Sequence, residues 1–211
     1  MVRDWPSTNL PKTIHPEEHK KKKADAYVQK PDIEIECLFN EVNLDFSKHQ
    51  SDSGNEFGNE LAESGWTKAA INAWKIAAIS GSPEAYYNLA MCYAHGDYAI
   101  KLWERASLLG HSLSTYQLAV CHINGYGNEK KCVDLGLQLM KLSAITGCAE
   151  AQFYLASQNL LNGSLKEGES YLLRAVRKQE FYDKAKEWLN VESTPANVKA
   201  VLQSVIQKSG M

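Results

Sequence analysis

One sequence pattern recurs three times in the 211-residue chain, and it constrains the fold more than any other feature. The copies read GSPEAYYNLAMCYAHG from Gly81, GHSLSTYQLAVCHING from Gly110 and GCAEAQFYLASQNLLNG from Gly147. Small and bulky apolar residues recur upstream of each glycine at fixed positions: Ala70, Trp74, Ala77 and Ala78; Ala99, Trp103, Ala106 and Ser107; Gly136, Met140, Ser143 and Ala144; and, in a less regular fourth copy, Gly168, Leu172, Ala175 and Val176. A repeat of this length is typical of folds in which one small unit stacks on the next.

Each copy has the spacing of a helical hairpin. Ala85, Leu89 and Cys92 recur at helical intervals and predict one apolar helix face, and Gly96 is expected to end that helix in a left-handed conformation. The upstream small residues predict a second helix that packs closely, with Trp74 filling the space between hairpins. Because one hairpin cannot bury such faces alone, several must stack. The predicted fold is all-α, a right-handed α-solenoid of helical hairpins.

Charge and proline divide the chain into four predicted parts. Residues 1–30 hold seven basic and four acidic groups with little apolar content, which predicts a disordered tail. Residues 31–64 hold one basic and nine acidic groups and lead into the first helix, after a loop at KHQSDSGNE. The solenoid is expected over 65–190, and a C-terminal helix or cap over 191–211.

Composition also excludes several classes of function. The net charge of −2 argues against a broadly basic nucleic-acid binder, and no apolar run is long enough to span a membrane. The first twenty residues resemble neither a secretory signal nor a mitochondrial presequence, so a cytoplasmic location is expected. No catalytic or phosphate-binding motif occurs, which predicts a protein that is not an enzyme and needs no cofactor.

The five cysteines form no CxxC pair, which favours a reducing compartment over a disulfide scaffold. Cys92 and His95 lie one helical turn apart and could place two metal ligands on one face. Cys121 occupies the equivalent place in the next copy without that histidine, so the pattern favours a core cysteine and no metal site.

The recurring residues resemble the Sel1-like repeat, a relative of the tetratricopeptide repeat. The best copy contains Ala70, Trp74, Ala77, Ala78, Gly81, Ala85, Asn88, Leu89, Ala90, Tyr93 and Gly96. Within that family, the run NEFGNELAESGWTKAAINAWKIAAISGSPEAYYNLAMCYAHG is similar to the first repeat of the death ligand signal enhancer proteins. This resemblance implies self-association, association with mitochondria, a link to apoptosis, and activation in the cytosol of the haem-regulated kinase that phosphorylates translation initiation factor 2.

A second apolar stripe runs along the first helix of each hairpin, opposite the face that contains Ala85 and Leu89. If the first helices line a groove, this stripe would bind a peptide or helix of a partner protein. The alternative is that the stripe packs on the second helices or on the acidic segment. The predicted protein-binding residues are Tyr87, Met91, Tyr116, Val120 and Phe153.

These observations predict a non-enzymatic protein-interaction scaffold, and the resemblance implies that it relays mitochondrial stress to the integrated stress response. The expected partners are proteins, among them the haem-regulated kinase and a second copy of the chain. The alternative is an assembly or quality-control adaptor in mitochondria or another compartment.

Overall fold

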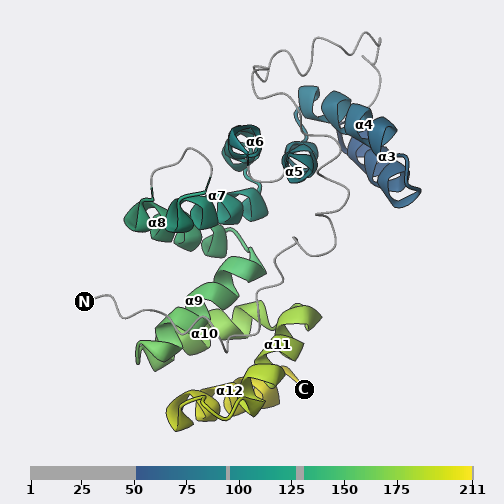
Figure 1. Cartoon of the computed structure of the whole chain (residues 1–211). Helices are drawn as coiled ribbons and strands as arrows, with labels where there is room; N and C mark the ends of the chain where they lie inside the picture. The colour runs from purple at the N-terminus through teal and green to yellow at the C-terminus, as the bar shows by residue number, and fades with distance from the viewer. Residues whose placement is uncertain (1–50, 94–95, 127–130, 211) are drawn as a thin grey trace. The chain divides into compact units, whose positions relative to one another are not determined.

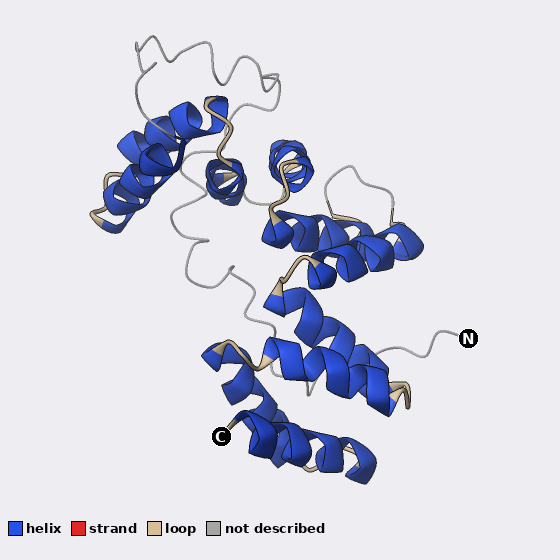
Figure 2. Ribbon diagram, turned by 180° about the vertical axis from the view of Figure 1, so that it is seen from behind, coloured by secondary structure: helices blue, strands red, loops and turns tan. Residues whose placement is uncertain are grey.

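The structure is a computed structural model that describes residues 51–93, 96–126 and 131–210. Within these ranges the chain forms ten helices and no strand (Figures 1 and 2), so the predicted all-α hairpin fold is confirmed. The helices are α3 (Ser51–Glu63), α4 (Thr67–Ile79), α5 (Pro83–Cys92), α6 (Asp97–Leu108), α7 (Ser112–Asn124), α8 (Val133–Ile145), α9 (Ala149–Leu161), α10 (Leu165–Ala175), α11 (Gln179–Asn190) and α12 (Ala196–Ser209). The predicted tail, residues 1–30, lies outside the described residues.

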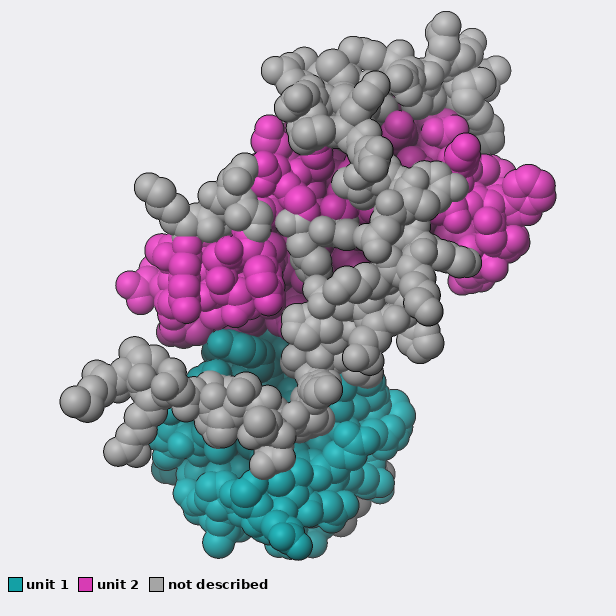
Figure 3. Space-filling view, viewed as in Figure 1, with its two compact units in different colours: residues 1–21, 143–211 teal, residues 22–142 magenta. Residues whose placement is uncertain are grey.

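The chain divides into two compact units (Figure 3). Unit 2 comprises residues 22–142, and unit 1 comprises residues 1–21 and 143–211. The boundary falls inside the last turn of α8.

In unit 2, α3 packs on α4 and α5 packs on α6, and α4 also packs on α5. The small residues of the repeat lie where these helices meet: Ala77 is 1% exposed, and Ala70, Ala99 and Ala106 are fully buried. Trp103 is buried beside them at 1% exposed. The close approach of helices inferred from these small residues is therefore confirmed.

One glycine shows how close this approach is. A Cβ atom at Gly58 of α3 would lie 2.4 Å from the ring of Trp74 on α4. The Trp74 indole donates a hydrogen bond from Nε1 to Oδ1 of Asn59, at 3.1 Å. A side chain at Gly58 would displace the ring, so α3 and α4 fit together only because this position has none.

The repeat glycines reverse the chain between hairpins. Gly81, Gly110 and Gly147 have φ angles of 96°, 91° and 103°, in the left-handed region that favours glycine. The residue after Gly81 begins the next helix: the Ser82 hydroxyl accepts a hydrogen bond from the Ala85 amide at 3.2 Å. A left-handed glycine therefore follows α4, α6 and α8, in the short turns that lead into α5, α7 and α9.

Unit 1 has its own core, formed by buried side chains from α9, α10, α11 and α12. Phe153 of α9 packs against two aromatic rings of α11, with centroids 5.3 Å from Phe181 and 6.2 Å from Trp188. Gly168, Leu172 and Ala175 of the fourth repeat copy are buried, as its register predicts.

Two local predictions are wrong. Gly96 does not end a helix in the left-handed region: its φ is −75°, α5 already ends at Cys92, and the Gly96 carbonyl accepts hydrogen bonds from the Ala99 and Ile100 amides at the start of α6. The loop expected over KHQSDSGNE is helical from Ser51, because α3 reaches back to pack along α4. The remaining residues of that predicted loop lie outside the described ranges.

Candidate protein-interaction surface

Four of the five predicted binding residues lie on two helices of unit 2. Tyr87 and Met91 are on α5, and Tyr116 and Val120 are on α7; all four are half-buried. We call these four residues the α5–α7 surface. Their partial exposure leaves apolar side-chain area available to a partner while the rest of each side chain is packed.

One ring contact joins the two helices of this surface. The centroid of the Tyr87 ring lies 5.0 Å from that of His111, with the ring planes tilted by 50°. His111 precedes α7 and caps it, because its Nδ1 accepts a hydrogen bond from the Ser114 amide at 3.2 Å. Tyr87 is therefore held against the beginning of α7.

The electrostatics of His111 follow from this position. Burial lowers the pKa of His111, and the carboxylate of Glu84 acts against that shift. The neutral ring is the form that can accept the Ser114 hydrogen bond at Nδ1. Burial thus favours the uncharged ring of His111 beside Tyr87.

The α5 part of the α5–α7 surface is anchored. Tyr87 and Met91 are packed against the hydrophobic core cluster of unit 2, which includes Leu89 and Trp103. Side chains held in this way lose little further conformational freedom when they bind, which favours association. The surface can therefore present pre-positioned apolar contacts.

Phe153 has a different place from the other predicted binding residues. It is 8% exposed and packs into the core of unit 1. A groove-lining role would require an accessible ring, so we assign Phe153 to the core.

The cysteines in the described ranges differ in exposure: Cys121 and Cys148 are buried, Cys92 is half-buried and Cys132 is exposed. No group of three or more His, Cys, Asp or Glu residues there could hold a metal ion, and His95 lies outside them. Cys148 is buried, with its Sγ 3.1 Å from a Glu150 carboxylate oxygen, and burial raises the pKa of this thiol to about 11. No helix in the described part of the chain is long and apolar enough to cross a membrane.

Two exposed aromatic residues were not predicted from the sequence, Phe57 on α3 and Trp66 between α3 and α4. A recurring exposed aliphatic position, two residues before each repeat glycine, was not predicted either; it is occupied by Ile79, Leu108 and Ile145. The aliphatic position could have been found from the alignment of the repeat copies, whereas Phe57 and Trp66 lie outside the repeat pattern.

These helices, with short turns and neighbour-on-neighbour packing, define an array of helical hairpins. No protein-family model and no curated protein sequence matches the chain. Among solved structures, immunity protein Pa5087 from Pseudomonas aeruginosa is similar over 88% of this chain and 86% of that chain, with 14% identity and a TM-score of 0.52, which shows a shared fold.

Two further solved structures have lower TM-scores. A Sel1 repeat protein from Oxalobacter formigenes matches 76% of this chain and 85% of its own, with 19% identity and a TM-score of 0.44. Immunity protein PA5088 from Pseudomonas aeruginosa matches 79% of this chain and 84% of its own, with 17% identity and a TM-score of 0.43.

Proposed function

We propose that the chain is a non-enzymatic protein-interaction scaffold of the Sel1-like type, and that it binds a peptide or helix of a partner through the α5–α7 surface. The observation that carries this proposal is the half-burial of Tyr87, Met91, Tyr116 and Val120 on two helices joined by the Tyr87–His111 contact. Anchored tyrosines of this kind often supply most of the binding energy at protein interfaces.

The finer proposal concerns the partner. The resemblance of residues 55–96 to the death ligand signal enhancer proteins supports a role in relaying mitochondrial stress, with the haem-regulated kinase as the bound protein. A second copy of the chain is the other candidate partner. On this proposal the scaffold acts in the cytoplasm, in association with mitochondria.

A binding measurement tests both levels of the proposal. Purified full-length chain is titrated into labelled haem-regulated kinase, and self-association is followed by sedimentation. The variant Tyr87→Ala/Tyr116→Ala removes two rings from the surface, whereas the control Ile79→Ala/Leu108→Ala shortens two exposed aliphatic side chains elsewhere in unit 2.

The tyrosine variant should stay folded and lose at least about 2 kcal/mol of binding free energy, as expected for interface anchors. The control should bind as tightly as the unchanged chain. Kinase binding that survives in the tyrosine variant would show that the α5–α7 surface is not the site. Complete absence of kinase binding by the unchanged chain would instead favour the assembly or quality-control adaptor.

A further inference from the structure

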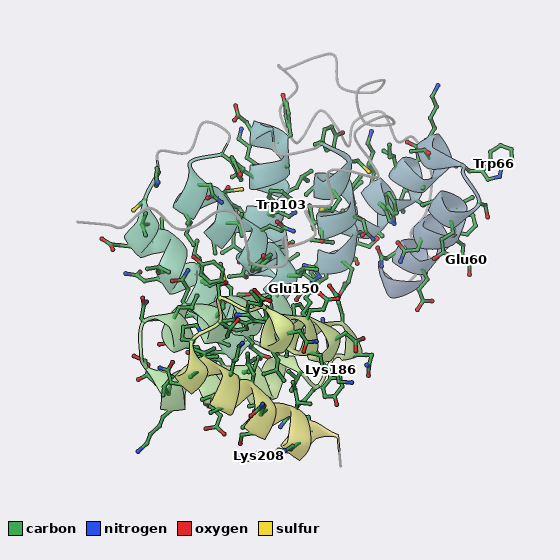
Figure 4. All side chains as sticks on the ribbon, turned by 60° about the horizontal axis from the view of Figure 1, so that its bottom comes forward. Glu60, Trp66, Trp103, Glu150, Lys186 and Lys208 are labelled. Carbon is green, nitrogen blue, oxygen red and sulfur yellow. The ribbon has the colours of Figure 1, made fainter. Side chains whose placement is uncertain are left out.

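Two aromatic side chains of the α3/α4 hairpin are largely exposed to solvent. Phe57 on α3 is 56% exposed, and Trp66, in the turn before α4, is 68% exposed. Figure 4 shows Trp66 projecting outward from this turn, with Glu60 on the outer side of α3. Trp66 also borders a shallow hollow at the start of α4, lined by residues 65–69. Large apolar side chains left exposed on one hairpin can mark an interaction site.

The exposed ring of Phe57 faces away from the hairpin that α3 packs against. On the inner side, the Asn88 amide of α5 donates hydrogen bonds from Nδ2 to Oδ1 of Asn55, at 2.9 Å, and to Oδ1 of Asn59, at 3.0 Å. Two residues along an α-helix correspond to a rotation of about 200°. Phe57 is two residues from each of these asparagines, so its side chain leaves α3 on the side opposite α5.

The charged side chains on the exposed side of α3 are all acidic, and they outnumber the one exposed basic residue that lines the hollow beside Trp66, Lys68 of α4. Glu56, Glu60 and Glu63 are exposed, and α3 has no basic residue in its last turn. Carboxylates near the C-terminal end of a helix are unfavourable, because the helix dipole is negative there. A cation bound beside Glu60 and Glu63 would offset both their mutual repulsion and this dipole effect.

We propose that Phe57, Trp66, Glu56, Glu60 and Glu63 form a docking face for a basic peptide segment of a partner protein. Lysine or arginine side chains of that segment would lie over the two rings as cation–π contacts and pair with the carboxylates. From Glu56 to Glu63 the helix rises about 10 Å, which suits a ligand of one to two helical turns or a few extended residues. This face shares no residue with the α5–α7 surface. A result that contradicts one proposal therefore leaves the other unaffected.

The test uses the full chain and a fluorescein-labelled peptide, LKRLLKRLAKRL, with the acidic peptide LEELLEELAEEL as the reference probe. Binding is followed by fluorescence anisotropy and by the shift in tryptophan emission. The charge variant is Glu56→Gln/Glu60→Gln/Glu63→Gln. Its matched control, Glu104→Gln/Glu187→Gln/Glu192→Gln, changes the net charge equally at exposed carboxylates elsewhere.

The basic peptide should bind and the acidic peptide should not, with affinity falling as salt is raised. The charge variant should weaken binding by about tenfold or more, as expected when complementary charges are removed, and the control should not. The variant Phe57→Ser/Trp66→Ser should weaken binding by a similar factor and abolish the emission shift. Because all five side chains are exposed, unchanged circular dichroism is expected for both variants.

Three results would overturn the proposal. Equal weakening by the charge variant and its control would show that only net charge matters. Undiminished binding by both variants would place the site elsewhere. Tighter binding after replacement of Lys20–Lys23 by serine would show that the chain's own lysine run is the occupant, not a partner.

Discussion

At the scale of single residues, equivalent repeat positions have unequal environments. Tyr87 and Phe153 occupy the same place in their copies, but Tyr87 meets the polar ring of His111, whereas Phe153 meets Phe181 and Trp188. The difference is set by the residues of the following hairpin. Alignment of the repeat copies therefore cannot show which of several equivalent residues is buried.

Truncation of the Tyr87 and Phe153 rings should lower the free energy of unfolding by unequal amounts. Phe153→Ala should lower the free energy of unfolding by about 3–5 kcal/mol, the usual cost of removing a buried aromatic side chain. Tyr87→Ala should cost clearly less, because its ring is only half-buried. Chemical denaturation of both variants checks this, and an equal loss for the two would mean that Tyr87 is also a core residue.

Substitution of a buried alanine by a large residue should destabilise the protein more than the same substitution at an exposed position. Ala77→Trp and Ala106→Trp should each destabilise the protein by about 1–3 kcal/mol or more, because no space exists for a larger side chain. Ile79→Trp and Leu108→Trp, on the same helices but exposed, are the matched controls and should change little. Thermal melts of the four variants give the comparison, and unchanged melting of the alanine variants would contradict the observed burial.

At the scale of helices, the sequence predicted the regular parts and missed parts of the connections. Burial of Ala70, Ala77 and Leu172 follows from spacing alone, because close helix packing requires small or well-fitted residues at fixed intervals. The start of α6 does not follow from spacing, since glycine occurs more often after a helix than before one, yet Gly96 precedes α6. The extent of α3 depends on packing along α4, which is a tertiary effect that local sequence does not show.

The histidine cap of α7 predicts a pH dependence. The unfolded pKa of histidine is about 6.5, and burial lowers the pKa of His111 in the folded state. The unfolded chain therefore binds a proton more readily, so stability is fully present above about pH 6.5 and declines as the pH falls below it. Protonation would also remove the acceptor for the Ser114 amide.

Unfolding free energies between about pH 5 and pH 8, a range that spans the ordinary histidine pKa, measure this effect. His111→Asn keeps a capping acceptor that does not titrate, and it should flatten this part of the pH profile. A profile unchanged by His111→Asn would show that other groups cause the acid destabilisation.

At the scale of the whole molecule, function depends on which surfaces remain after the hairpins have packed. The sequence predicted the hairpin array and four residues of the α5–α7 surface, because both follow from the repeat. It did not predict the exposed pair Phe57 and Trp66, since exposure depends on which neighbouring hairpins are present. The proposed interaction sites thus belong to two separate surfaces of unit 2.

Removal of residues 1–30 tests the predicted organisation of the chain. Their low apolar content and seven basic groups give them little surface to bury. The shortened chain should therefore keep its melting temperature within about 2 °C, the change that less than 1 kcal/mol produces in a chain of this size. A drop of several degrees would show that this segment contributes to the packed structure.

The pairing of consecutive helices also affects how the chain folds. α3 packs on α4, α5 on α6 and α9 on α10, and each pair is joined by a short connection. Short loops cost little closure entropy, and contacts close in sequence favour rapid folding. During synthesis, the α3/α4 hairpin can therefore form while later hairpins are still inside the ribosome, so that α5 meets a folded α4 on which to pack.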